Sequence, residues 1–63
     1  MKNKITAQWQ PCSNEKIMAF GYTTEMVVVE SNHPRFTRGT RFDFGFLRIA
    51  TDEGYSVEIL PQN

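Results

Sequence analysis

The chain has 63 residues, and its seven Lys and Arg residues balance its seven Asp and Glu residues, so the formal net charge is zero. Hydrophobic residues make up 40% and aromatic residues 13% of the chain, which excludes the composition of a disordered segment. This length predicts one domain over residues 1–63, with only about 60% of the unfolded surface buried. The one cysteine excludes an intrachain disulfide.

The apolar runs of the chain are short. The longest, Ile17–Phe20 and Val27–Val29, fall far below the length of about 20 residues that a transmembrane helix needs. The basic start at residues 1–4 is followed by alternating polar residues and not by the apolar stretch of a secretory signal. We therefore expect no membrane association and a cytoplasmic location.

Two strands are predicted in the first half of the chain. Apolar and polar residues alternate from Ile5 to Gln10, which is the period of a strand with one buried face, and Pro11 ends that strand. Residues 25–31 are rich in valine and predict a second strand. Its three consecutive valines favour a central position in the sheet. The residues that follow, 32–34, break the strand.

Residues 13–22 are compatible with two structures. A strand over 16–22 is favoured, because so short a helix gains little stability on its own. The alternative is a two-turn helix that begins at the N-cap Ser13 and stops at Gly21.

The C-terminal third predicts a hairpin. Strands over 41–50 and 55–60 flank a short turn in which Gly54 supplies a positive φ. The resulting register pairs Ile49 with Val57, Leu47 with Ile59 and Arg48 with Glu58. Such apolar and opposite-charge pairs stabilise a sheet by about 0.2–1 kcal/mol each.

The phenylalanines of the first hairpin strand are out of phase with its aliphatic residues. Under strict alternation Phe42, Phe44 and Phe46 share a face with Arg48. A bulge at Gly45 is predicted to bring Phe42 and Phe44 back to the buried face, with Phe46 pointing outward.

These elements define the expected fold class as mainly β. The sheet is expected to be small and antiparallel, with four to five strands, either open or curled into a small barrel. The alternative is an α+β fold with one short helix at about residues 13–20. The aromatic residues expected to fill the core are Trp9, Phe20, Phe42 and Phe44.

Catalytic chemistry has little support in the sequence. Cys12 and His33 are the only candidates for a nucleophile and its base, and their spacing does not show that they meet. We expect Cys12 to be an inert thiol and His33 to face solvent. One cysteine and one histidine do not supply the four ligands of a structural zinc site. The sequence therefore predicts no enzyme, no metal and no cofactor.

The arginines form the most informative feature. All four lie between residues 35 and 48, where they alternate with aromatic residues, and in residues 33–50 only Asp43 opposes them. Arginine and aromatic residues are enriched at the energetic centres of protein interfaces. The predicted partner-binding residues are Arg35, Phe36, Arg38, Arg41, Phe46 and Arg48.

A protein is the favoured partner. The expected function is that of a regulatory or inhibitory interaction module, of the kind common among small phage and mobile-element proteins. The alternative is a module that binds single-stranded RNA or DNA along segment 35–48, stacking bases on aromatics and pairing phosphates with arginines. The zero net charge disfavours that alternative and is compatible with a homodimer. A competing interpretation is that the arginines pair with Glu25, Glu30, Asp52, Glu53 and Glu58.

Overall fold

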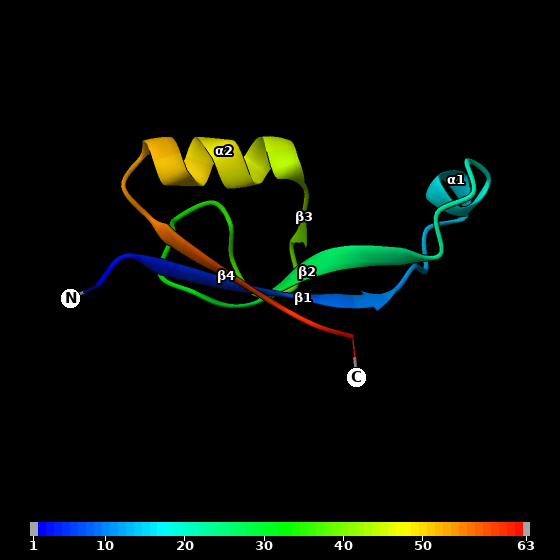
Figure 1. The fold of residues 1–63 in the computed structure, drawn as a ribbon, viewed down its shortest axis with the longest axis horizontal. Coiled ribbons are helices and arrows are strands. Elements are labelled where there is room, and N and C mark those ends of the chain that lie inside the picture. Colours follow the sequence, from blue (N-terminus) through cyan, green and yellow to red (C-terminus); the bar gives the residue numbers. More distant parts are fainter. Residues whose placement is uncertain (1, 63) are drawn as a thin grey trace.

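The computed structural model describes residues 2–62. They form an open sheet of four strands, together with two helices (Figure 1). The strands are β1 (Lys4–Pro11), β2 (Thr24–Ser31), β3 (Arg41–Phe42) and β4 (Ser56–Leu60), and the helices are α1 (Glu15–Met18) and α2 (Phe44–Asp52). Strands account for 38% and helices for 21% of these residues. The mainly β class with four strands is therefore confirmed, and the sheet is not closed into a barrel.

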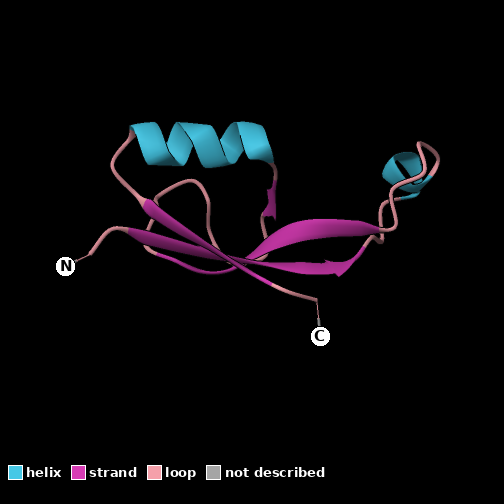
Figure 2. Cartoon of the chain, in the orientation of Figure 1, coloured by secondary structure: helices cyan, strands magenta, loops and turns pink. Residues whose placement is uncertain are grey.

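The order of the strands across the sheet is β3-β2-β1-β4. β2 is antiparallel to both of its neighbours, whereas β4 runs parallel to β1. The expectation of an all-antiparallel sheet is thus wrong at β4. β3 and β4 run in the same direction at opposite edges, so the chain between them has to cross over the sheet. α2 provides this crossover (Figure 2).

The two strands predicted in the first half of the chain are confirmed. β1 buries Ile5 and Ala7 completely, while Thr6 and Gln8, which alternate with them, stay partly exposed, as the pattern predicts. β2 occupies the predicted central position.

The predicted strand over 41–50 and the C-terminal hairpin are wrong. The chain leaves the sheet after Phe42, and the Asp43 carboxylate caps α2 by accepting a hydrogen bond from the Phe46 N–H at 2.8 Å. Gly45 lies inside α2 and makes no bulge. Leu47 and Ala50, three residues apart, turn to the sheet, which is the spacing of a helix face and not of a strand.

The predicted cross-strand pairs are replaced by others. β4 pairs with β1, so that Val57 lies beside Ile5 and Ile59 beside Ala7. The Glu58 carboxylate lies 2.8 Å from the Lys4 ammonium, where the hairpin would have placed Arg48. This ion pair raises the pKa of Lys4 above its usual value, first through the hydrogen bond to Glu58.

The segment between β1 and β2 contains the short helix of the alternative prediction, and the favoured strand over 16–22 is wrong. The N-cap is Asn14 rather than Ser13, and its Oδ1 accepts hydrogen bonds from the backbone N–H groups of Lys16 and Ile17. α1 ends at Met18, earlier than predicted, and the chain turns back through Gly21 at a φ of +94°.

The core lies between α2, the loop 32–40 and one face of the sheet. Its buried members are Ile5, Ala7, Met26, Val28, Phe36, Phe42 and Ala50. α2 has nine residues and is therefore about 13 Å long, whereas the eight residues of β1 span about 26 Å. α2 consequently covers only about half the length of the central strands, and Figure 1 shows α1 beyond the other half.

Candidate functional site

An open groove of about 380 Å³ lies on the part of the sheet that α2 leaves uncovered. Trp9, Met26 and Phe42 form its floor, because the strand register places them side by side across β1, β2 and β3. All three belong to the core-facing side of the sheet. The floor of the groove is thus an extension of the hydrophobic core toward solvent.

Aromatic side chains line both sides of this groove. Phe20 and Tyr22 come from the turn after α1 and are 82% and 63% exposed, and Phe44 begins α2 and is 67% exposed. Fully exposed phenylalanines carry a hydrophobic cost of about 1.5–3 kcal/mol each relative to a buried position. This concentration of exposed aromatic surface makes the groove a candidate interaction site.

One ion pair lies at the polar edge of the groove. Arg41 Nε lies 3.3 Å from Glu25 Oε1, and the Ser13 N–H donates to Glu25 Oε2 at 3.2 Å. The Cys12 thiol, the Ser13 N–H and Arg41 hold the pKa of Glu25 below its usual 4.5, against the opposing effect of burial. The carboxylate therefore stays ionised and paired, and the groove edge has no uncompensated charge from this pair.

The predicted partner-binding residues Arg35 and Phe36 have other contacts in the fold. Phe36 is only 7% exposed and packs edge-on against Phe42, so its ring belongs to the core and not to the surface. Arg35 lies over the Phe36 ring at 5.9 Å and pairs with Glu53 at 3.3 Å.

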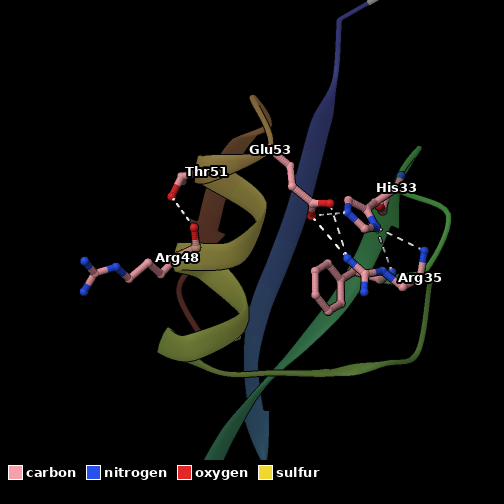
Figure 3. A network of polar contacts seen from close by, with 7 residues as sticks. His33, Arg35, Arg48, Thr51 and Glu53 are labelled. Atoms are coloured by element: carbon pink, nitrogen blue, oxygen red, sulfur yellow. Dashed lines mark hydrogen bonds and ion pairs between the residues drawn. The ribbon is translucent and has the colours of Figure 1, made fainter.

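The remaining predicted residues come from the loop 32–40, β3 and α2. Arg38 is exposed in the loop 32–40, and Arg41 is held by Glu25 at the groove. Phe46 packs on the core ring of Phe36. Figure 3 shows that Arg48 extends from the side of α2 opposite to Arg35. Two of the four arginines are thus engaged in the ion pairs of the competing interpretation, with Glu53 and Glu25.

His33 is buried, contrary to the expectation of a solvent-facing side chain. Its Nδ1 accepts hydrogen bonds from the backbone N–H groups of Arg35 and Phe36, at 3.0 and 3.2 Å. Because Nδ1 acts as acceptor, Nε2 carries the proton and donates to Glu53 Oε1 at 3.0 Å. The ring therefore fixes the start of the loop 32–40 against the end of α2 (Figure 3).

Cys12 and His33 are not brought together. Cys12 is buried near the start of α1, where its thiol lies 3.8 Å from the Asn14 carbonyl, whereas His33 contacts Glu53 and Tyr55. Within residues 2–62, no three His, Cys, Asp or Glu side chains gather as a metal site would require.

The groove was not predicted from the sequence. Phe42 fills the core as expected, but Phe20 and Phe44 were also expected there and instead lie exposed. Only the apolar run Ile17–Phe20 beside Tyr22 hinted at this surface, since one short helix turn does not bury so many apolar residues.

Comparison of the chain with protein-family models, curated proteins and solved structures gives no match. Over residues 2–62, neither helix has the length and apolar character needed to cross a membrane.

Proposed function

We propose that this protein is a non-enzymatic protein-binding module, and that the groove lined by Trp9, Phe20, Tyr22 and Phe44 is its docking site. The observation that carries the proposal is the exposure of three aromatic side chains around an apolar floor. Interfaces gain most of their affinity where aromatic side chains become fully desolvated. An apolar segment of another polypeptide supplies the matching surface.

A module of this kind acts by occupancy and not by chemistry. It regulates or inhibits the polypeptide whose segment it holds, and it needs neither a cofactor nor a metal for this. The single buried Cys12 suits a reducing cytoplasm, where thiols stay free.

Single-stranded nucleic acid is the less supported partner. Binding to phosphates needs arginines that share one face, whereas Arg35 and Arg41 are paired with carboxylates and Arg48 lies on the far side of α2. The groove itself offers aromatic rings, but its nearest guanidinium, that of Arg41, is neutralised by Glu25.

The test compares matched surface variants in a capture experiment. The groove variants are Phe20→Ser and Phe44→Ser, the arginine variant combines Arg38→Glu with Arg48→Glu, and Ile49→Ser removes an exposed apolar side chain outside the groove. Each immobilised variant is incubated with nuclease-treated lysate at low and high salt, and captured proteins are quantified by mass spectrometry.

We expect protein partners to fall by at least about 10-fold with the groove variants and to persist with the other two. Partners lost with the arginine variant and retained by both groove variants would overturn the docking site. Nucleic acid that co-purifies without nuclease and leaves with salt would support the alternative partner class. Arg41→Glu is unsuitable as a probe, because it would place a second carboxylate against Glu25 and disturb the fold.

A further inference from the structure

The groove and the most exposed aromatic side chain of the chain are adjacent. Phe20, at 82% exposure, lines one side of the groove, and Phe44 lines the other side at the start of α2. The same surface therefore presents both a projecting ring and a cavity that accepts a ring. A two-fold axis through such a surface places each projecting ring in the cavity of the other copy.

The charges around the groove favour a neutral occupant. Glu25 and Arg41 neutralise each other, and the Asp43 carboxylate is bound to the Phe46 N–H at the positive end of α2. The groove thus selects neither an acidic nor a basic partner. This chain is itself neutral, so two copies approach without net repulsion.

The exposed apolar area is of the right order for a weak dimer. Aromatic side chains bury about 150–250 Å² each, so Phe20, Tyr22 and Phe44 offer about 400 Å² per copy at their observed exposures. Two copies would bury about 800 Å² if these rings became fully covered. This area is below the lower end of stable interfaces, about 1,200 Å², and is in the range of weak, transient contacts. Chains this short commonly gain stability by oligomerisation.

We propose that the polypeptide seated in the groove is a second copy of this chain, in a two-fold dimer in which Phe20 of each copy lies against Phe44 of the other. This inference rests on the proposed function, because both require that the groove receive a polypeptide. The inference adds that this polypeptide is a second copy of the chain.

The first test is sedimentation equilibrium of the purified chain from micromolar to sub-millimolar concentration. We expect a reversible monomer–dimer equilibrium whose affinity is unchanged or higher at high salt, as apolar burial requires. Phe20→Ser should weaken the dimer by about 100-fold, because the symmetric interface loses the ring twice. Ile49→Ser, outside the groove, should leave the dissociation constant within about 3-fold.

The second test fixes the geometry by cross-linking. In a Cys12→Ala background, Phe20→Cys and Phe44→Cys are prepared separately, mixed and oxidised. We expect a disulfide to form between Phe20→Cys and Phe44→Cys. It should form in higher yield than the disulfide obtained when either variant is mixed with an Ile49→Cys variant. Phe20 and Phe44 are both exposed, so these changes leave the core intact, and circular dichroism checks that they do.

The outcomes separate this inference from the proposed function. A chain that stays monomeric throughout the concentration range, or a dimer unaffected by Phe20→Ser, overturns the second copy as occupant. If the groove variants of the same monomeric chain still lose their captured protein partners, the proposed function stands without the dimer. If neither self-association nor partner capture depends on Phe20 and Phe44, both proposals fail.

Discussion

Single residues at the start of the loop 32–40 and at the end of α2 carry more of the structure than their types suggest. His33 uses both ring nitrogens in hydrogen bonds, and its ring packs at a tilt against Phe36 and Tyr55, with centroids 4.5–4.6 Å apart. Glu53 receives His33 Nε2–H and Arg35 at the end of α2, and these contacts, led by the His33 hydrogen bond, hold its pKa below the usual value. A carboxylate on the surface thereby links a loop to a helix.

Two carboxylates make stability depend on pH in the acid range. The folded-state pKa values of Glu25 and Glu53 lie below their usual 4.5, so their contribution is present above 4.5 and is lost as pH falls through the folded values. We expect the urea concentration at the midpoint of unfolding to decrease once the pH is lowered below about 4.5. Glu53→Gln should flatten this dependence, and Glu15→Gln, whose carboxylate has no ion pair in residues 2–62, should not. Parallel profiles for Glu53→Gln and the unaltered chain would contradict this.

Among the elements, α2 shows how one sequence pattern fits two structures. Phe42, Phe44 and Phe46 alternate as a strand would, while Phe46 and Ala50 repeat at the spacing of a helix face. Interactions at the two ends of the segment favour the helix over the strand. Asp43 caps its start, and its end is a Schellman motif, in which the Gly54 N–H donates to the Thr51 carbonyl and the Tyr55 N–H to the Ala50 carbonyl, both at 3.0 Å.

Gly54 is needed for this helix end. Its φ is +88°, and a Cβ added there meets nothing within 4 Å, so the cost of substitution comes from the backbone alone. We expect Gly54→Val to lower the free energy of unfolding by about 1–2 kcal/mol, and Gly54→Asn, which tolerates positive φ, to lower it by less. Urea denaturation followed by circular dichroism measures both. Equal stability of the valine variant and the unaltered chain would rule out this role for Gly54.

At the scale of the whole molecule, an elongated shape of 38 × 22 × 16 Å leaves one end of the sheet without a covering layer. The core lies beneath α2 and the loop 32–40, and the groove lies toward α1. The molecule therefore has a stabilising half and a half whose apolar surface is available for contact. Phenylalanines at neighbouring positions differ accordingly, since Phe42 is buried and Phe44 is exposed.

Phe42 and Phe44 provide a direct comparison of a buried and an exposed phenylalanine. Phe42 is 2% exposed and packs against Phe36, so Phe42→Ala should cost about 3–5 kcal/mol, comparable to the whole stability of so short a chain. Phe44→Ala should cost less than about 0.5 kcal/mol, since its ring is exposed. Thermal unfolding monitored by circular dichroism distinguishes them. A cooperative transition for Phe42→Ala at the original temperature would contradict this division.

The features that depend on local conformation could be predicted from the sequence. The alternation of Ile5–Gln10 defined β1 and its buried face, the valines predicted the central β2, and Gly54 was identified as a positive-φ position. Backbone φ and side-chain alternation are properties of a few adjacent residues, so they can be read without knowing the fold.

The partner of β4, and with it the helix over 44–52, could not be predicted from local sequence and depends on how the whole chain folds. β4 pairs in parallel with β1, which lies about 50 residues earlier in the chain, and that pairing requires a crossover in place of the predicted hairpin. The candidate groove has the same origin. Whether Phe20 and Phe44 are buried depends on how the two helices lie over the sheet. Phe44 is the first residue of α2 and Phe20 lies in the turn after α1, and the helices leave both side chains exposed. Burial is a property of the assembled layers, so residue type and spacing did not reveal it.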